Sequence, residues 1–403
     1  MTTPAWSLRA LMPGVYLPVI VVEIGIGAIL PFIPAEVVDR GGSLATAGAM
    51  AALIPVGRIL ADLPAGGLAN RIGDRRAMIL ACLLAAGAAA LVASAPGLVL
   101  LAVGLFLLGA SDAVFGLARQ SYLTAVVPPM QRARALSTLG GVARIGLFIG
   151  PFAGALVVRE DPTVAFWLAV ATSLVAGGQV LLSRELAGAA QVAQQEGHGT
   201  VVATIREHLH LLTRLGVAIL AVGLVRGARM TALPLWGEHL QLDPSTTALI
   251  VGVAGGVDML LFYPAGKLMD ARGRLWVAIP SMITMGAAFV ALPFTSTALG
   301  LTGVALLLGI GNGMGSGVVM TLGADVAPAA DRAAFLGAWR LLYDAGSAAG
   351  PLGLSAGAAL GSLAGGVWAM AGFSAAAALA LWKMVPRFSV HANRGTRRRA
   401  GIE

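Results

Sequence analysis

The stretch Pro64-Ala65-Gly66-Gly67-Leu68-Ala69-Asn70-Arg71-Ile72-Gly73-Asp74-Arg75-Arg76 is a short basic turn between two long apolar runs. The chain repeats this turn 200 residues later as Pro264-Ala265-Gly266-Lys267-Leu268-Met269-Asp270-Ala271-Arg272-Gly273-Arg274. Proline, alanine, glycine, leucine and glycine keep their places in both copies. A basic turn that recurs between apolar runs predicts a duplicated bundle of membrane helices.

The composition excludes an ordinary soluble protein, because the chain has too few charged residues to cover a water-exposed surface. Of the 403 residues, 58% are hydrophobic and only 11% are charged, whereas soluble domains carry about 25% charged residues. The net charge of +8 does not indicate nucleic acid, because the arginines lie between apolar runs rather than on one domain face. The single cysteine, Cys82, lies in an apolar run and cannot build a disulfide framework or a thiolate metal site.

Apolar runs of about 20 residues, each long enough to cross a bilayer as a helix, recur along the whole chain. We predict twelve spans, at 14–38, 44–68, 77–95, 97–126, 137–158, 163–183, 212–237, 245–268, 275–294, 297–326, 333–357 and 363–385. Arginine and lysine gather in the loops on one side, and only Arg40 and Arg159 lie on the other. The excess of positive charge marks the cytoplasmic side. Both termini are therefore predicted to be cytoplasmic in a multi-pass protein of the bacterial inner membrane.

The two halves match at an offset of 200 in several further places. Leu107-Leu108-Gly109 returns as Leu307-Leu308-Gly309, and Gly146, Gly150 and Pro151 return as Gly346, Gly350 and Pro351. We predict an all-α membrane fold of two pseudo-symmetric six-helix bundles, 1–183 and 212–386, joined by a cytoplasmic linker at 184–211 and followed by a basic tail at 387–403. In transporters built from such repeats, the site lies at the interface of the halves near mid-membrane. The tail either anchors the topology or binds anionic lipid.

Two motifs resemble those of the major facilitator superfamily, and the resemblance extends over essentially the whole chain. The loop signature comprises Gly66, Asn70, Arg71, Gly73 and Arg75, with Gly266, Asp270 and Gly273 in the second copy. The span 5 signature comprises Gly146, Gly150, Pro151 and Gly154 and resembles that of the proton-coupled antiporters. The family's usual aspartate is replaced by Asn70, and Leu105 stands where an arginine is usual in span 4. The resemblance implies alternating access around a cavity lined mainly by spans 1, 4, 7 and 10.

Ionisable residues inside spans are costly and are candidates for function. Arg58 corresponds to Asp258 at the offset of 200, and Arg144 corresponds to Asp344. In the family's geometry span 2 meets span 11 and span 5 meets span 8. This arrangement predicts two gating ion pairs on the cytoplasmic side, Arg58–Asp344 and Arg144–Asp258. The alternative is pairing within one helix, of Arg58 with Asp62 and of Arg340 with Asp344, at i,i+4 spacing.

Two carboxylates are candidates for carrying a coupling proton. Glu23 lies in span 1 and Asp112 near the middle of span 4. A carboxylate in a semi-dry cavity can be protonated near neutral pH. The alternative is that Glu23 neutralises Arg119 or Arg226, or faces a water-filled vestibule.

Residues of spans 4, 7 and 10 are predicted to line the substrate cavity. A guanidinium suits an anionic group on a substrate, and the alternative for the span 7 arginines is a salt bridge to Glu23 or Asp112. Arg119 either lines the cavity or anchors its helix. The predicted cavity residues are Arg226, Arg229, Asn312, Phe115, Met230 and Arg119.

The first functional hypothesis is a secondary transporter that exports small amphipathic molecules or drugs in exchange for protons. The alternative is proton-coupled or passive transport of a small metabolite such as a sugar, an amino acid or an organic anion. A membrane enzyme is the remote alternative, because the sequence shows no nucleophile–base arrangement and no cluster of metal ligands. A transporter-like sensor would need a partner domain. We expect no cofactor, no metal and no nucleic acid as partner, and we expect a monomer whose partners are substrate, protons and membrane lipid.

Overall fold

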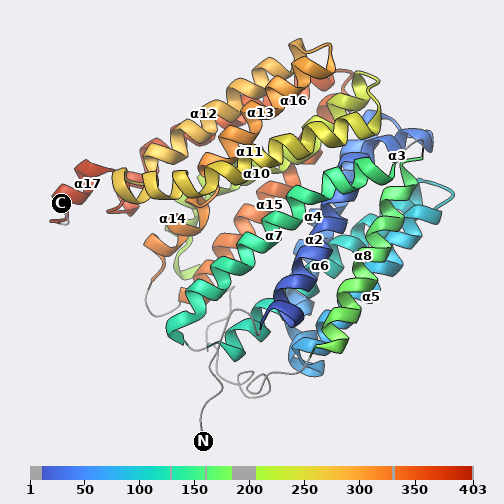
Figure 1. Cartoon of the computed structure of the whole chain (residues 1–403). Coiled ribbons are helices and arrows are strands. Elements are labelled where there is room, and N and C mark those ends of the chain that lie inside the picture. The colour runs from blue at the N-terminus through green and yellow to red at the C-terminus, as the bar shows by residue number, and fades with distance from the viewer. Residues whose placement is uncertain (1–10, 128, 159–160, 184–205, 329–331, 402–403) are drawn as a thin grey trace, which may run out of the picture. The chain divides into compact units, whose positions relative to one another are not determined.

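The computed structural model describes residues 11–127, 129–158, 161–183, 206–328 and 332–401. It divides into two compact units. Unit 1 comprises Met1–Gly42 and Leu53–Glu196, and unit 2 comprises Ser43–Ala52 and Gly197–Glu403. Most of the linker predicted at 184–211 lies outside the described residues. In Figure 1 the helices of unit 1 run from blue to green and those of unit 2 mainly from yellow to red.

The first span is helical throughout but changes its helix type three times. It passes from a π-helical turn (η1, Met12–Tyr16) to α2 (Leu17–Ile29), a 3₁₀ turn (η2, Leu30–Phe32) and α3 (Ile33–Asp39). A proline stands at the first or second position of each of these elements. Proline cannot donate the helical hydrogen bond, and it favours such local changes of winding.

The remaining helices repeat at the offset of 200, which confirms the predicted pseudo-symmetric fold. The helix α4 (Leu44–Ile72) returns as α11 (Pro244–Arg272), and α6 (Leu98–Val126) returns as α13 (Ala298–Gly315) and α14 (Val318–Val326). The others of the first half are α5 (Asp74–Ser94), α7 (Pro129–Val157) and α8 (Thr163–Leu182). The others of the second half are α10 (Leu209–His239), α12 (Leu275–Ala291) with η3 (Leu292–Phe294), α15 (Arg332–Ala359), α16 (Leu363–Phe388) and α17 (Arg394–Arg399).

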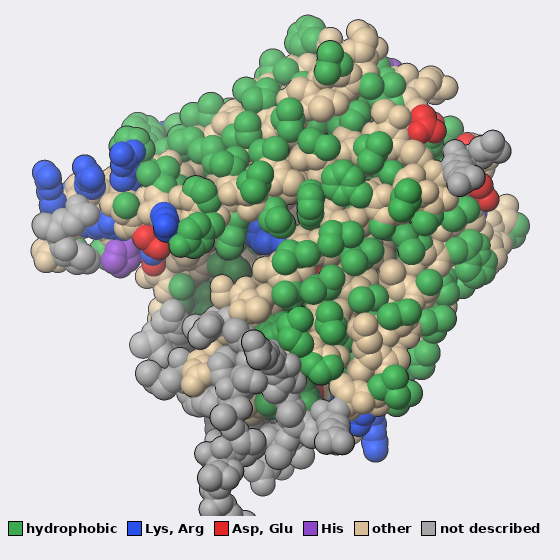
Figure 2. Space-filling view, in the orientation of Figure 1, with side chains coloured by type: hydrophobic (Ala, Val, Ile, Leu, Met, Phe, Trp, Pro, Cys, Tyr) green, Lys and Arg blue, Asp and Glu red, His purple; other side chains and the backbone are tan. Residues whose placement is uncertain are grey.

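Eleven helices of the described part are long and apolar enough to cross a membrane. They correspond to eleven of the twelve predicted spans. The remaining one, predicted at 333–357, lies within α15, which is helical over 28 residues but is not among the eleven. Figure 2 shows hydrophobic side chains spread over the visible helices, while arginines and lysines gather at the end where α17 lies.

Close helix contacts are made by glycines of the span 5 signature. The helix α7 packs against α2, and α15 packs against α10 at the equivalent place. A Cβ atom on Gly150 would lie 2.6 Å from the Cα of Gly27, and one on Gly350 would lie 2.9 Å from the carbonyl carbon of Gly227. The missing side chains therefore let these helix backbones touch, as in other membrane bundles.

Candidate functional site

In unit 1, four of the predicted residues form two ion pairs. Glu23 on α2 is buried and pairs with Arg119 of α6, with Oε1 and Nη1 3.2 Å apart. Asp112 of α6 pairs with Arg58 of α4, with Oδ2 and Nη1 2.9 Å apart. The charges of Asp112 and Arg58 also act on Glu23. The two pairs therefore form one electrostatic network, in which each carboxylate has its own arginine.

A pocket lies beside this network, within unit 1. It is small, with a volume of about 20 Å³, and it is partly open to solvent. Its walls are mostly aliphatic, with a few polar groups, among them Asp112 and two serines. The lining residues are Val22, Gly25, Ile26, Ile29, Ala81, Cys82, Ala85, Leu108, Ser111, Asp112, Phe115, Ala169 and Ser173. The lining is of the kind found at small-molecule sites, but the space has room for about one water molecule.

Gly146 of the span 5 signature packs against Glu23. A Cβ atom at Gly146 would lie 2.6 Å from the Cβ of Glu23 and 2.6 Å from the carbonyl oxygen of Ile20. Because Gly146 has no side chain, α7 can contact the turn of α2 that carries Glu23. Phe115 also contacts the network, with the Arg119 guanidinium 5.6 Å from its ring centre. Both neighbours fix the Glu23–Arg119 pair in place.

In unit 2, a second polar cluster forms around Asp258 of α11. Its Oδ2 atom accepts a 2.6 Å hydrogen bond from Nδ2 of Asn312 and lies 3.4 Å from Nη2 of Arg229. Arg226 is buried and donates to the backbone oxygen of Asn312 at 3.4 Å. Four of the predicted residues therefore gather here from α10, α11 and α13, and this cluster holds two arginines but one carboxylate. Met230 lies next to Arg229 along the chain and is exposed.

The cluster lies at an interruption of the tenth span. The helix α13 ends at Gly315 and α14 begins at Val318, so carbonyl groups of the last turn of α13 lack their usual helical partners. The guanidinium of Arg226 supplies one partner at Asn312, and Ser281 of α12 donates to the carbonyl of Gly311 at 2.6 Å. A cation near a helix C-terminus is favourable, which accounts for part of the stability of a buried arginine here.

Four of the six predicted gating residues have a partner inside their own unit. Arg58 pairs with Asp112, and Asp258 pairs with Arg229. Arg340 and Asp344 form the pair at i,i+4 spacing, 3.6 Å apart, that was the alternative for them. Asp62 lies on α4, and Arg144 lies on α7 two residues before Gly146. The pairs Arg58–Asp344 and Arg144–Asp258 across the halves stay a prediction.

The two copies of the loop signature differ in their surroundings. Gly73 and Gly273 both have positive φ angles, 86° and 105°. Nothing lies within 4 Å of a Cβ atom placed on Gly73, whereas one on Gly273 would lie 2.7 Å from the backbone oxygen of Ala392. In the first copy, Arg75 donates to the backbone oxygens of Val180, Leu181 and Ser183, which end α8. The side chain of Asn70 lies outside the described part of the structure.

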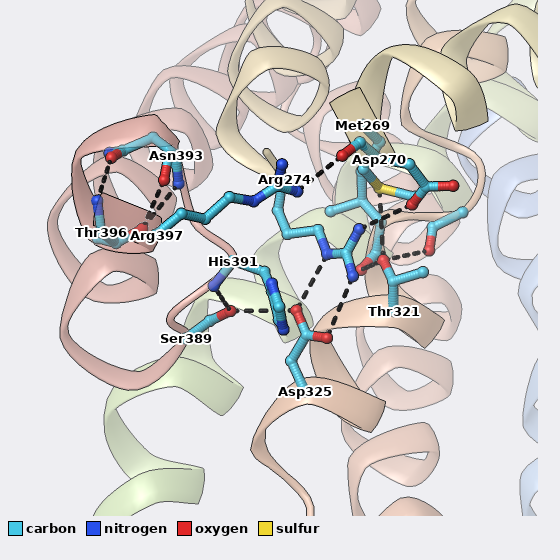
Figure 3. Close-up of polar contacts among 12 residues, drawn as sticks. Met269, Asp270, Arg274, Thr321, Asp325, Ser389, His391, Asn393, Thr396 and Arg397 are labelled. Atoms are coloured by element: carbon cyan, nitrogen blue, oxygen red, sulfur yellow. Dashed lines mark hydrogen bonds and ion pairs between the residues drawn. The ribbon is translucent and has the colours of Figure 1, made fainter. Parts of the chain in front are cut away.

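The C-terminal tail covers the second copy, as Figure 3 shows. The backbone nitrogens of Arg274 and Leu275 donate to the carbonyls of His391 and Ala392, each at 3.0 Å. Arg397 in turn donates from Nη2 to the backbone oxygen of Asp270 at 2.8 Å. The tail therefore supplies partners to the end of α11 and to the start of α12.

A carboxylate that the sequence analysis did not single out ties this assembly to the tenth span. Asp325 of α14 binds Arg274 through two contacts of 3.0 and 3.2 Å, and it accepts a hydrogen bond from Ser389. Asp270, the predicted signature acid, also pairs with Arg274 at 3.1 Å. Burial lowers the pKa of Arg274, but its hydrogen bonds and ion pairs with Asp325 and Asp270 outweigh burial and raise it above its usual range. The signal in the sequence was the acid near the end of a span, opposite a basic loop.

The family follows from a comparison with known proteins. The model of the Major Facilitator Superfamily matches residues 16–351 and, in a second match, 215–401. The chain therefore belongs to the major facilitator superfamily of membrane transporters.

Several relatives resemble it at low identity. "Multidrug resistance protein MdtH" of Klebsiella pneumoniae is 25% identical over 306 residues, which cover 75% of this chain and 72% of that protein. "Multidrug resistance protein 2" of Bacillus subtilis is 24% identical over 271 residues, 64% of this chain and 66% of that protein.

Solved structures share the fold at lower identity. A bacterial homolog of the human lysosomal transporter Spinster, in an inward-facing and unoccupied conformation, has a TM-score of 0.78 at 14% identity and covers 96% of this chain and 98% of its own. The nucleoside transporter NupG has a TM-score of 0.73 at 16% identity and covers 91% of this chain and 98% of its own. Identities this low establish the fold and leave the substrate open.

Proposed function

We propose that the protein is a secondary active transporter that works by alternating access and exports small amphipathic molecules in exchange for protons. Membership of the family supports the transporter class. The multidrug resistance proteins among its relatives support export of amphipathic compounds.

The Glu23–Arg119 pair is the observation on which proton coupling rests. Glu23 is 7% exposed, lies inside a span and has Arg119 as its hydrogen-bonded partner at 3.2 Å. Protonation of this carboxylate abolishes its charge and weakens its hold on the guanidinium. Arg119 can then turn to another anion, and α2 and α6 lose one bond between them. Asp112 is the second candidate, since Arg58 holds it in the same way.

The test is transport in proteoliposomes with an imposed pH gradient, screened over drugs, sugars and amino acids. We expect an amphipathic compound to move with a countercurrent of protons, read from a pH dye inside the vesicles. Glu23→Gln should abolish the proton flux. Glu36→Gln is the matched control, because Glu36 is also buried on the same span but pairs with Arg40. Compound flux without any proton flux would show a facilitator instead.

Transport of a small organic anion is a second candidate, favoured by the charge of the unit 2 cluster. Arg229 pairs with the Asp258 carboxylate, whereas the neighbouring Arg226 donates to a backbone oxygen, that of Asn312. The Nε atoms of both arginines are buried without a hydrogen-bond partner among the described residues. A substrate carboxylate would supply the missing negative charge. Competition between a benzoate series and neutral amides in the same vesicles separates this candidate from the first.

The excess of arginine and lysine on one side of the membrane supports a cytoplasmic location for that side. Both termini would lie in the cytoplasm of a bacterium, with the protein a monomer in the inner membrane. The exposed arginines of the tail, Arg394, Arg398 and Arg399, would then meet anionic lipid headgroups. Arg58–Asp344 and Arg144–Asp258 would close the cytoplasmic side in one state of the cycle and exchange for the partners within each unit in another.

A further inference from the structure

Positive charge is concentrated at the end of unit 2 where α11 ends, α12 begins and the tail docks (Figure 3). The segments 263–276, 318–326 and 382–401 come together there, and they hold nine arginines and lysines but only two aspartates. Both aspartates bind Arg274. The excess of positive charge therefore faces solvent or a partner from outside the chain, and it is visible beside α17 in Figure 2.

The short helix α17 holds its arginines in a fixed arrangement. A capping box between Asn393 and Thr396 begins the helix. Arg397 is buried and donates from Nη2 to a backbone oxygen of the second signature loop at 2.8 Å. Arg394 and Arg398 are exposed and, being four residues apart, lie on the same face of the helix. One arginine thus anchors α17, and the exposed pair is presented to a partner from a docked helix.

Exposed aromatic rings accompany the cations on the helices beside the tail. The Arg272 guanidinium lies 5.3 Å from the ring centre of Trp276, and the Lys267 ammonium lies 4.7 Å from that of Tyr263. Trp276 is 51% exposed and Tyr263 is 67% exposed, so both rings face outward. Tryptophan and tyrosine gather at the level of the lipid head groups, and the long stems of lysine and arginine reach the same level. These pairs therefore have the composition of a membrane boundary.

Unit 1 gives an internal comparison, because the same loop carries its charge differently there. Gly67 and Ile72 stand in place of Lys267 and Arg272, and Arg76 stands in place of Trp276. The two cation–aromatic pairs thus have no equivalent at the corresponding positions of unit 1. A surface that combines them with docked arginines belongs to the described part of unit 2.

We propose that this end of unit 2 binds the head groups of anionic phospholipids, with α17 and the two cation–aromatic pairs as one surface. An arginine guanidinium matches the oxygens of a phosphate group and can donate two parallel hydrogen bonds to it. A lipid is favoured over a free phosphate ion, because the exposed rings place the cations at the boundary between hydrocarbon and water. This surface requires the lipid contact proposed above for the tail, and it is independent of proton exchange.

Binding of short-chain lipids to the purified full chain in non-ionic detergent tests the surface without any transport. Dioctanoyl phosphatidylglycerol and dioctanoyl phosphatidylcholine have the same chains and differ in net charge. We expect calorimetric titration to give an affinity about tenfold higher for phosphatidylglycerol, with a difference that shrinks as salt is added. Equal affinities for the two lipids overturn the proposal. Competition by inorganic phosphate at equal concentration also overturns it, because the site would then belong to a free anion.

Two double variants locate the bound lipid. Arg394→Gln with Arg398→Gln should lower the phosphatidylglycerol affinity about tenfold and leave phosphatidylcholine binding unchanged. Arg71→Gln with Arg76→Gln removes two exposed arginines from the first copy of the loop and is the matched control. The control should leave the affinity within about twofold, since salt screens charges that do not lie near the lipid. Equal losses in the two variants would mean a general attraction to positive charge and refute the surface.

A further variant separates docked arginines from charge alone. Asn393→Ala removes the capping box of α17 and keeps every arginine. We expect it to lower the phosphatidylglycerol affinity about threefold, because the arginines of a frayed helix lose their common face. An unchanged affinity refutes the docked helix as the binding element.

Melting temperature and gel filtration of each variant report whether it folds. The four substituted arginines are exposed, so both double variants are expected to fold like the unchanged protein. No gradient enters these titrations, so a failure of lipid binding and a failure of proton coupling give different results.

Discussion

The same pair of positions is an ion pair in one unit and a hydrogen bond between an amide and a carboxylate in the other. Arg58 and Asp112 touch at 2.9 Å, and their counterparts Asp258 and Asn312 touch at 2.6 Å. The contact between the second and fourth helix of each half is thus kept, while its charge is reassigned. Asp258 then takes its counter-charge from Arg229 of α10, where unit 1 has Ile29. The two halves therefore keep the same contact between their second and fourth helices but use different residue types, and so different charges, to make it.

The largest effect is expected from removing the cation on which Asp258 depends. Arg229 and Asp258 are 12% and 15% exposed, and loss of one member of a buried pair costs about 3–5 kcal/mol. Arg229→Met should therefore lower the melting temperature strongly, and Arg229→Met with Asp258→Leu should recover most of the loss. If the single variant is as stable as the unchanged protein, the unit 2 cluster does not rely on this pair.

A charge reversal at Arg58 compares its partner within unit 1 with its predicted partner across the halves. Arg58→Asp should reduce transport at least tenfold, because it places two carboxylates side by side. Rescue by Asp112→Arg would show that the pair inside unit 1 carries the function. Rescue by Asp344→Arg would show the predicted gate, and rescue by neither rules out both pairs as functional elements. Transport rates at matched protein amounts in vesicles are the measurement.

A matched pair of alanine substitutions measures the docking of the tail. Gly73 and Gly273 both occupy a backbone region reserved for glycine, so alanine at either costs about 1–3 kcal/mol. Gly273→Ala should cost more, since its Cβ would also press on Ala392. The melting temperature reports the cost, and the rate of proteolysis at Arg394–Arg399 reports release of the tail. Equal losses and an equally protected tail would show that the tail contact is weak.

The smallest effect is expected at the pair within α15. Arg340 is 53% exposed, and exposed pairs contribute little because water screens them. Arg340→Gln should leave the melting temperature within the error of the measurement. A clear loss would mean that Arg340 has a role beyond its pair with Asp344, and it would be examined by transport under the same conditions.

The sequence was sufficient to predict the fold, because each apolar run indicates a span by itself and the repeat is visible when the two halves are compared. Both copies of the glycine turn and the bounds of the long helices follow from where apolar runs stop. It also singled out Glu23, Asp112, Arg58 and Asp258 as candidates, because a charge inside a span is rare enough to be noticed.

Partners were harder to predict than candidate residues. Which arginine meets Glu23 depends on helix rotation, and a rotation of one residue changes the partner. Asp325 was overlooked because it lies at the end of its span, where a charge is ordinary. The docking of Arg397 was equally hidden, since a run of arginines near a terminus has the same appearance whether it is held or solvated.

The break between α13 and α14 divides the tenth span into two parts with different attachments. The first part, α13, is bonded to Ser281 and Arg226. The second part, α14, is bonded through Asp325 to Arg274 and Ser389. Because Ser316 and Gly317 join the two parts without a continuous helix, a tilt of α14 changes few bonds of α13. The tail is therefore bonded to one part of the tenth span and the polar cluster to the other.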